Sequence, residues 1–296
     1  MNSIKLLIKS IVKKIYRSLP WKIIDRIEYY RSFGKLPNIR NPKTFNEKVL
    51  YRKRHACLTD SQYALLADKY AVRQYVSDKI GEQYLIPLYA MYPTPEAFAA
   101  EVDQYSNFVL KSNHGAGMVK LIDAVNTEEE KQKLIQEVEH WFEYDFSAKH
   151  GEMHYAKIKR CVLIEEKIGE GNDPLTDYKI HLFRQSNGEV FYILQIIDER
   201  KNGVLSRSFY VNNLNEIYSG HYHLDSNKKE TMNTMLELSQ ELMGDLEYVR
   251  MDWYFENGRI YFGEVTLTPA SGVGLGYGDE LDKLMGSWWD LSLAPR

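Results

Sequence analysis

Two apolar segments near the end of the chain, residues 249–255 and 259–265, most constrain its fold. Asn257 and Gly258 lie between them and form a pair typical of the two-residue turn of a β-hairpin. Such a turn makes the two segments neighbouring antiparallel strands. The chain is therefore expected to contain an antiparallel sheet that carries this hairpin.

Four polar side chains interrupt these apolar strands. Alternation places Arg250 and Asp252 on one face of the first strand, and Glu264 and Thr266 on one face of the second. Pairing through the turn brings the carboxylates of Asp252 and Glu264 together. Two carboxylates on a buried sheet face are costly without a cation, and Mg²⁺ with ATP phosphates would compensate them. A structural ion pair of Arg250 with Glu264 is the alternative.

A strand that ends in lysine precedes a loop of small residues. The strand covers residues 108–111, and a second short strand follows the loop at residues 119–122. Lys111 offers a point charge to phosphate oxygens, and Gly115 and Gly117 let backbone amides approach a ligand closely. The loop matches neither a Walker loop nor a dinucleotide fingerprint, so a plain hairpin turn is the alternative.

An apolar strand becomes abruptly charged within residues 162–168, and the acidic, glycine-containing residues 169–173 follow it. Backbone groups at such a strand edge can bind the edge of adenine, and Glu170 or Asp173 could accept ribose hydroxyls. The alternative is a strand followed by a solvated turn.

The other elements predict an α+β chain. Thr127 and Glu130 form a capping box that begins a helix, and Asn187 and Gly188 predict a hairpin between residues 178–183 and 190–197. Further helices are predicted for residues 21–33, 45–54, 61–79 and 228–243. The parts follow in order as a helical N-terminal segment, an N-terminal lobe, a small α+β lid and a larger antiparallel-sheet domain: residues 1–40, 41–106, 107–168 and 169–296.

Charge is unevenly distributed along the chain. Residues 1–40 carry ten Lys or Arg against two Asp or Glu, whereas the whole chain has a net charge of −3. Residues 1–18 predict a basic amphipathic helix for peripheral contact with an anionic membrane face, and a helix packed on its own domain is the alternative. The overall balance excludes a general nucleic-acid footprint. Cys57 and Cys161 lack the spacing of a metal or redox motif, which favours a reduced cytoplasmic protein.

The order of these motifs resembles the ATP-grasp superfamily, and most closely its TupA-like branch of teichuronopeptide synthesis. The similarity covers nearly all of the chain after residue 40, through residues 41–48, 66–73, 111–115 and 262–269. It implies an α+β ATP-grasp fold in which ATP lies between the lid and the larger sheet domain.

The resemblance also implies roles for individual residues. ATP would be bound by one lysine, the glycine loop, the strand edge and one acid: Lys111, His114, Gly115, Gly117, Glu165, Glu166, Lys167, Ile168 and Asp173. Lys179 and Arg250 would act on the transferred phosphoryl group. Mg²⁺ would be held by two carboxylates and a hydroxyl: Asp252, Glu264 and Thr266. Many ATP-grasp enzymes have Asn where this chain has Thr266, and a hydroxyl is the weaker ligand. The substrate would be bound by four residues: His154, Thr268, Ser271 and Gly272.

The implied activity is that of an ATP- and Mg²⁺-dependent ligase. It would join a carboxylate, on a small molecule or a saccharide, to an amine such as an amino acid through an acyl phosphate, and so modify a cell-surface polysaccharide or its precursor. A glycosyltransferase is one alternative, although the sequence lacks an Asp-x-Asp metal motif. A non-catalytic nucleotide-binding protein is the other, and only Thr266 points to it.

Overall fold

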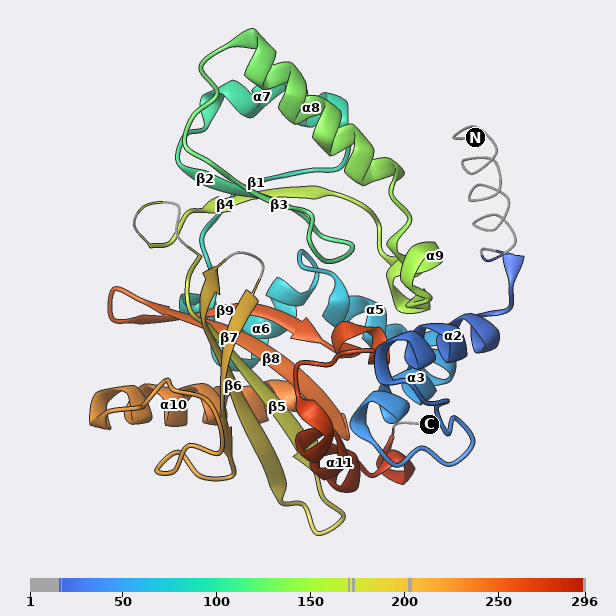
Figure 1. The fold of residues 1–296 in the computed structure, drawn as a ribbon. Coiled ribbons are helices and arrows are strands. Elements are labelled where there is room, and N and C mark those ends of the chain that lie inside the picture. The colour runs from blue at the N-terminus through green and yellow to red at the C-terminus, as the bar shows by residue number, and fades with distance from the viewer. Residues whose placement is uncertain (1–15, 17, 170, 172–173, 202–203, 295–296) are drawn as a thin grey trace. The chain divides into compact units, whose positions relative to one another are not determined.

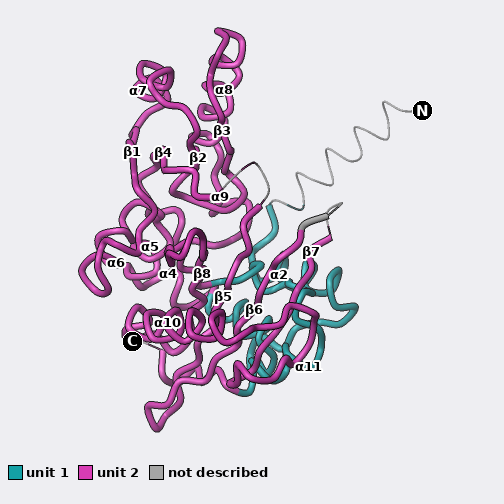
Figure 2. Tube along the Cα trace, turned by 90° about the vertical axis from the view of Figure 1, so that its left-hand side faces the viewer, with its two compact units in different colours: residues 1–52, 268–287 teal, residues 53–267, 288–296 magenta. Residues whose placement is uncertain are grey.

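The computed structural model describes residues 16, 18–169, 171, 174–201 and 204–294. Most of the basic segment 1–18 lies outside these residues, as do Glu170 and Asp173 of the predicted nucleotide site. The chain divides into a smaller unit, residues 1–52 with 268–287, and a larger unit, residues 53–267 with 288–296 (Figure 2). The four sequential parts expected from the sequence stay predictions.

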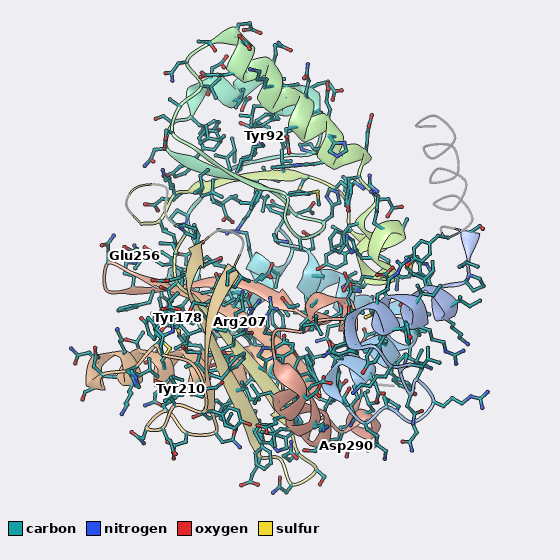
Figure 3. The ribbon with its side chains drawn as sticks, in the orientation of Figure 1. Tyr92, Tyr178, Arg207, Tyr210, Glu256 and Asp290 are labelled. Carbon is teal, nitrogen blue, oxygen red and sulfur yellow. The ribbon has the colours of Figure 1, made fainter. Side chains whose placement is uncertain are left out.

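A four-stranded antiparallel sheet in the larger unit forms the lid. Its strand order is β1-β4-β2-β3, with β1 (Leu88–Tyr92), β2 (Phe108–Ser112), β3 (Val119–Ile122) and β4 (Val162–Glu166). One face packs under α7 (Pro95–Glu101) and α8 (Glu128–Glu143), and Tyr92 lies between the sheet and these helices (Figures 1 and 3). The sheet thus includes β1, from the segment that the sequence assigned to the N-terminal lobe.

Local signals that predicted the lid are present in it. The strands on either side of the glycine loop pair directly, with Lys111 opposite Val119. Thr127 and Glu130 form the expected capping box at the start of α8. Because Phe108 and Leu110 point into the apolar core under α8, the alternating residues Val109 and Lys111 face away from the helices.

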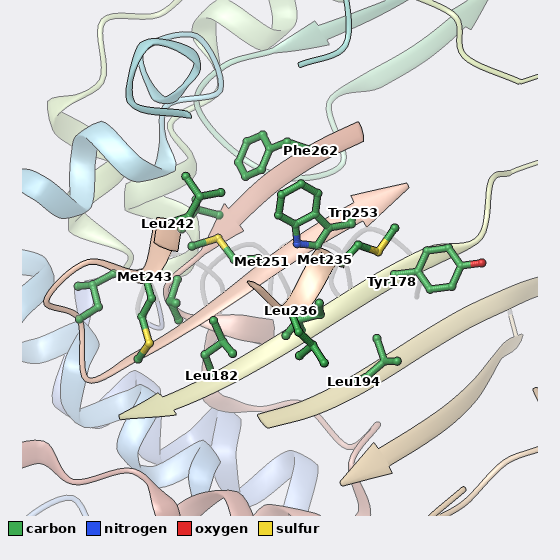
Figure 4. Close-up of a cluster of buried hydrophobic side chains, with 14 of the residues drawn as sticks. Tyr178, Leu182, Leu194, Met235, Leu236, Leu242, Met243, Met251, Trp253 and Phe262 are labelled. Atoms are coloured by element: carbon green, nitrogen blue, oxygen red, sulfur yellow. The ribbon is translucent and has the colours of Figure 1, made fainter. Parts of the chain in front are cut away.

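A five-stranded antiparallel sheet is the second sheet of the larger unit, in the order β7-β6-β5-β8-β9. Its strands are β5 (Asp177–Arg184), β6 (Val190–Lys201), β7 (Val204–Val211), β8 (Tyr248–Glu256) and β9 (Arg259–Thr266). Both predicted hairpins are confirmed. One sheet face packs on α6 (Val72–Ile80) and α10 (Ser226–Met243) through a core that includes Leu182, Met251 and Trp253 (Figure 4). The opposite face carries the polar residues.

The prediction of one continuous helix over residues 61–79 is wrong. This segment is divided into α5 (Ser61–Ala67) and α6, because Asp68 adopts an extended backbone conformation. The Asp68 carboxylate accepts the N–H groups of Tyr70 and Ala71 at 2.9 and 3.2 Å, in the turn that precedes the second helix. The break places residues 68 and 69 in a short connection at the edge of the lid.

The remaining helices are short or lie partly in the smaller unit. Helix α2 (Trp21–Phe33) ends at Gly34 with a left-handed φ of 67°, as predicted from the sequence. The others are α3 (Phe45–Arg54), α4 (Ala56–Thr59), α9 (Phe146–His150) and α11 (Gly278–Trp288). Short 3₁₀ segments are η1 (Glu82–Tyr84), η2 (Val102–Gln104), η3 (Met153–Lys157), η4 (Pro269–Gly272) and η5 (Leu291–Leu293). Within the described residues, no helix is both long and apolar enough to cross a membrane.

Candidate functional site

Asp252 lies at the centre of an ion-pair network on the polar face of the five-stranded sheet. Its side chain is 3% exposed and accepts hydrogen bonds from Arg250 at 2.6 and 2.7 Å. Lys179, opposite Asp252 on β5, donates to the same carboxylate. Burial alone raises the pKa of Asp252, but the two cations outweigh burial and hold that pKa below its usual value. Asp252 is therefore ionised and fully engaged with cations.

The carboxylates of Glu264 and Asp252 meet on the β8–β9 hairpin, as expected. The two residues are directly opposite because the register shifts by one residue, as at a β-bulge, between Asp252 and Trp253. Glu264 accepts hydrogen bonds from Arg250 and from the Thr266 hydroxyl, each at 3.2 Å. A third of its side chain is exposed, so it is the more accessible carboxylate of the pair. The carboxylates meet, as a metal site would require, and Arg250 pairs with each of them, as the alternative of a structural ion pair requires. The metal role of the two acids stays a prediction.

Lys69 is a site residue to which the sequence reasoning assigned no role. Its ammonium lies 3.7 Å from a Glu264 oxygen and donates to the carbonyl of Gly115 in the glycine loop. Burial lowers the pKa of Lys69, although the charge of Glu264 opposes this effect. The available signal was a lysine beside Asp68, at a helix break that the apolar periodicity concealed.

A second ion-pair cluster lies on the face of the lid away from its helices. Lys111 pairs with Glu165, and Arg73 from α6 lies 3.1 Å from the same carboxylate. The Glu165 side chain is only 3% exposed. The lysine predicted to bind phosphate and the acid predicted to line adenine are therefore brought together.

The neighbouring strand-edge residues have partners of their own. The N–H of Glu166 donates to the carbonyl of Pro87 at 2.9 Å, and Lys167 pairs with Asp123 at 2.8 Å. The role of Glu166, Lys167 and Ile168 in adenine binding stays a prediction, and Asp173 lies outside the described residues.

Asn113 fastens the base of the glycine loop. Its amide donates to the Asp68 carboxylate at 2.8 Å and to the carbonyl of Lys159 at 2.9 Å. Its carbonyl oxygen accepts the N–H of Cys161 at 2.8 Å. Because the fully buried Asn113 binds both the helix break and the chain before β4, the loop begins from a fixed point.

His114 also holds the loop to the lid. Its Nδ1 lies 2.7 Å from the Ser112 hydroxyl, and its Nε2 lies 3.0 Å from the carbonyl oxygen of Trp141. A carbonyl oxygen only accepts, so Nε2 carries the proton. Burial lowers the pKa of His114 to about 4, which keeps the ring neutral. Any contact of residue 114 with phosphate is thus left to its backbone.

The two glycines of the loop differ in their surroundings. A Cβ at Gly115 would lie 2.7 Å from atoms of both Met118 and Phe146, so the absence of a side chain permits this close packing. Gly117 has a left-handed φ of 78°, and nothing lies within 4 Å of the Cβ position. The first glycine is required for packing and the second for backbone conformation.

The residues predicted to bind substrate fall into two groups. His154 is buried in η3, and its ring lies 4.4 Å from the ring of Tyr155. Burial raises the pKa of Tyr155 well above its usual value, and the charges of Glu152 and Glu264 raise it further. The segment η3 therefore lies within electrostatic range of the carboxylate pair. The second group, Thr268, Ser271 and Gly272, belongs to the smaller unit and follows β9 in the chain.

The carboxylate pair fits Mg²⁺ that is brought by a nucleotide. Among the residues that the structure describes, no group of three or more His, Cys, Asp or Glu side chains forms a metal site. Asp252 and Glu264 offer hard oxygen ligands, and Mg²⁺ commonly takes one or two carboxylates together with substrate phosphates. In this structure the two carboxylates pair with Arg250, Lys179 and Lys69. When a nucleotide brings Mg²⁺, its phosphates could pair with these cations, which would leave the carboxylates to bind the metal.

The sequence matches the TupA-like ATP-grasp family over residues 47–289. The chain belongs to this family. Family membership confirms the predicted α+β ATP-grasp fold and the predicted cofactors, ATP and Mg²⁺. The roles of individual residues in this TupA-like protein stay predictions.

Solved structures are similar to this TupA-like protein at low sequence identity. An L-amino acid ligase from Bacillus licheniformis has a TM-score of 0.50 and 12% identity, over 86% of this chain and 57% of that chain. A D-alanine-D-alanine ligase from Helicobacter pylori has a TM-score of 0.45 and 16% identity, over 76% and 61%. N5-carboxyaminoimidazole synthetase from Staphylococcus aureus, complexed with ADP, has a TM-score of 0.44 and 13% identity, over 78% and 53%.

The matched region covers 53% to 61% of the length of these three ligase chains. No curated protein sequence matches significantly.

Proposed function

We propose that this protein joins a carboxylate to an amine through an acyl phosphate, at the expense of ATP and with Mg²⁺. The observation that carries the proposal is the facing pair Asp252 and Glu264, surrounded by Arg250, Lys179 and Lys69. Two acids with three cations suit a metal–nucleotide complex, because phosphates and metal can exchange partners with the side chains without leaving a charge unpaired.

Each cation has a place in this proposal. Lys111 and Lys69 hold the phosphates from the lid and from the helix break, and Lys179 contacts the transferred phosphoryl group. Arg250 stabilises the charge that develops on the phosphoryl group and on the substrate carboxylate. Bound Mg²⁺ supplies further charge neutralisation at the phosphates, with Asp252 and Glu264 as its protein ligands. Thr266 orients Glu264, because its hydroxyl already donates to that carboxylate.

The reaction proceeds in two displacements. An oxygen of the substrate carboxylate attacks the γ-phosphorus, and the bond to the ADP oxygen breaks. The nitrogen of a neutral amine then attacks the acyl carbon, and inorganic phosphate leaves with the carboxylate oxygen while the amine loses a proton. Because an acyl phosphate also reacts with water, the glycine loop has to cover it, and Lys69 holds that loop through the carbonyl of Gly115.

The substrate class is proposed from the family resemblance. A saccharide carboxylate such as a uronic acid would be the acyl donor and an amino acid the amine, in the modification of a cell-surface polysaccharide or its precursor. His154, Thr268, Ser271 and Gly272 are the proposed substrate residues. Two buried free cysteines and a need for ATP favour the cytoplasm.

Residues 1–18 are proposed to hold the protein at an anionic membrane face, where a lipid-linked precursor would be reached. Five basic residues within this segment support electrostatic attraction to anionic lipid. A variant that lacks residues 1–18 is expected to lose the binding to phosphatidylserine vesicles that the full chain shows. On phosphatidylcholine vesicles, both proteins are expected to bind only at background level. Equal binding of both proteins to the anionic vesicles would contradict the proposal.

Trapping the acyl phosphate with hydroxylamine tests the proposed reaction. The protein is incubated with Mg-ATP, hydroxylamine and a panel of uronic acids and amino acids, and ADP and hydroxamate are measured together. Hydroxamate that forms with one acid, in step with ADP, supports the proposal and identifies the acyl donor. ADP without hydroxamate for every acid of the panel, in a protein that binds Mg-ATP, would contradict it.

A further inference from the structure

The motif of residues 41–48 supplies two side chains with different tasks. Glu47 caps the start of α3, because its carboxylate accepts the backbone N–H groups of Asn38 and Lys43 at 2.8 Å and of Thr44 at 3.2 Å. Asn46, the residue before it, takes no part in this cap and is fully buried. A buried amide needs partners of its own, and these come from far along the chain.

Asn46 connects two later segments of the smaller unit. Its backbone N–H and its side-chain amide both donate to one carboxylate oxygen of Asp282 in α11, each at 2.8 Å. The N–H of Gly274 donates to the side-chain oxygen Oδ1 of Asn46 at 3.0 Å, and the Asn46 side-chain amide donates to the Gly274 carbonyl at 3.2 Å. One side chain therefore ties the helix α11 to the loop that follows η4.

This loop has an unusual backbone. Ala270, Ser271 and Gly272 have φ values of 47°, 54° and 78°, so three successive residues are left-handed and two of them carry a side chain. Left-handed conformations are unfavourable for residues other than glycine, and they persist where the surrounding structure holds them. A Cβ at Gly272 would lie 2.9 Å from the backbone carbonyl oxygen of Asn46 and 2.9 Å from the Leu50 side chain. The turn is therefore packed tightly against α3.

The left-handed turn contains the residues proposed to contact the substrate carboxylate. The Ser271 N–H donates to the Thr268 carbonyl at 3.0 Å, and the Val273 N–H donates to the Ala270 carbonyl at 3.0 Å. These bonds give Thr268 and Ser271 a fixed mutual orientation. The turn cannot relax without changing the direction of both hydroxyls.

We propose that Asn46 and Asp282 are positioning residues, which hold the left-handed turn Ala270–Gly272 so that Thr268 and Ser271 bind the carboxylate of the acyl donor. The inference rests on the proposed function and adds a residue pair that does not itself touch the substrate. Their purpose is to determine the affinity and orientation of the donor carboxylate, whereas Mg-ATP binding belongs to other residues.

Four variants separate positioning from general stability. Asp282→Ala removes the acceptor of both Asn46 donors, whereas Asp282→Asn keeps an acceptor oxygen of the same shape. Burial raises the pKa of Asp282, so a neutral amide is well tolerated at this site. Asn46→Ala removes the connection from its other side. Asp279→Ala is the matched control, because Asp279 is an exposed acid in the first turn of the same helix.

Hydrogen exchange tests whether the pair holds the turn. Amides of residues 270–274 are expected to exchange at least about tenfold faster in Asp282→Ala and Asn46→Ala than in Asp282→Asn, Asp279→Ala and the wild type. Unchanged exchange in the two alanine variants would overturn the inference, and this readout needs no substrate.

Hydroxamate kinetics test the functional part, with the acid that the panel identifies. In Asp282→Ala and Asn46→Ala, kcat/KM for the acid is expected to fall about 10- to 100-fold, because a displaced binding group loses orientation. The Kd for Mg-ATP should change less than about twofold, and Asp282→Asn should restore the acid kinetics. Faster exchange with unchanged kinetics would overturn the positioning role. A wild type that binds Mg-ATP and forms no hydroxamate would instead contradict the proposed function on which the inference rests.

Discussion

His114 makes the stability of the protein depend on pH in a calculable direction. The folded chain holds its pKa at about 4, against an ordinary value of 6.5, chiefly because the ring is buried. Below about pH 6.5 the unfolded chain therefore binds a proton that the folded chain does not accept. Stability is present above this range and is lost as the pH falls from about 6.5 towards about 4.

The magnitude follows from the same two pKa values. Their difference lowers the free energy of unfolding by about 3 kcal/mol when the pH is below both pKa values. Between about pH 7 and about pH 5, the linkage relation gives a loss of about 2 kcal/mol in the free energy of unfolding. His181 is also buried, and burial lowers its pKa, so the wild type loses stability through both histidines. The contribution of His114 is therefore the difference between the wild type and a His114→Gln variant.

Urea unfolding at the two pH values measures this difference. His114→Gln keeps a donor that can reach the Trp141 carbonyl, and it is expected to be about 2 kcal/mol less sensitive to the pH change than the wild type. His140→Gln, at an exposed position of the same helix as Trp141, is the control and should keep the wild-type sensitivity. If wild type and His114→Gln lost equal stability on acidification, the neutral buried ring and its role in the loop would be refuted.

Three further variants test the site. Lys69→Met should weaken binding of a fluorescent ATP analogue by about 10- to 100-fold, because it removes a charged donor. The control Lys131→Met, on the lid surface, should keep the wild-type affinity. Equal affinities of Lys69→Met and the wild type would exclude Lys69 from the nucleotide site. Asp252→Asn should abolish Mg²⁺-dependent ADP release and also destabilise the fold by about 3 kcal/mol in urea unfolding, since Arg250 loses its buried partner; retained ADP release would remove Asp252 as a metal ligand. Gly115→Ala should displace the glycine loop from Phe146 and raise the KM for ATP in steady-state assays; an unchanged KM would show that this packing does not shape the site.

The hairpins could be predicted because their signals are local. Asn257 and Gly258 determine the turn, which brings Asp252 and Glu264 close together. Their directly opposite positions also need the register shift between Asp252 and Trp253, which the sequence pattern did not predict. The same reasoning found Lys111 and the glycine loop, since strand alternation makes Lys111 point away from the lid core.

Other features depend on contacts that no local pattern contains. The carboxylate of Asp282 lies 236 residues from Asn46 in sequence, so their hydrogen bonds could not be inferred from spacing. The break at Asp68 was hidden because apolar periodicity continues on both sides of it, and the role of Lys69 was hidden with it. His114 was expected at ATP because the family resemblance includes it in the loop that closes over the phosphates, and its side chain is buried against α8. Burial of a polar ring depends on the tertiary structure around it.

Transfer of oxygen-18 from the carboxylate to phosphate tests the central claim most directly. The acyl donor is labelled in its carboxylate oxygens, and the inorganic phosphate released with Mg-ATP and amine is analysed by mass spectrometry. Attack of the carboxylate on the γ-phosphorus predicts one labelled oxygen in each phosphate formed. Phosphate without label, whether it forms in step with the amide or with no amide at all, would contradict an acyl phosphate.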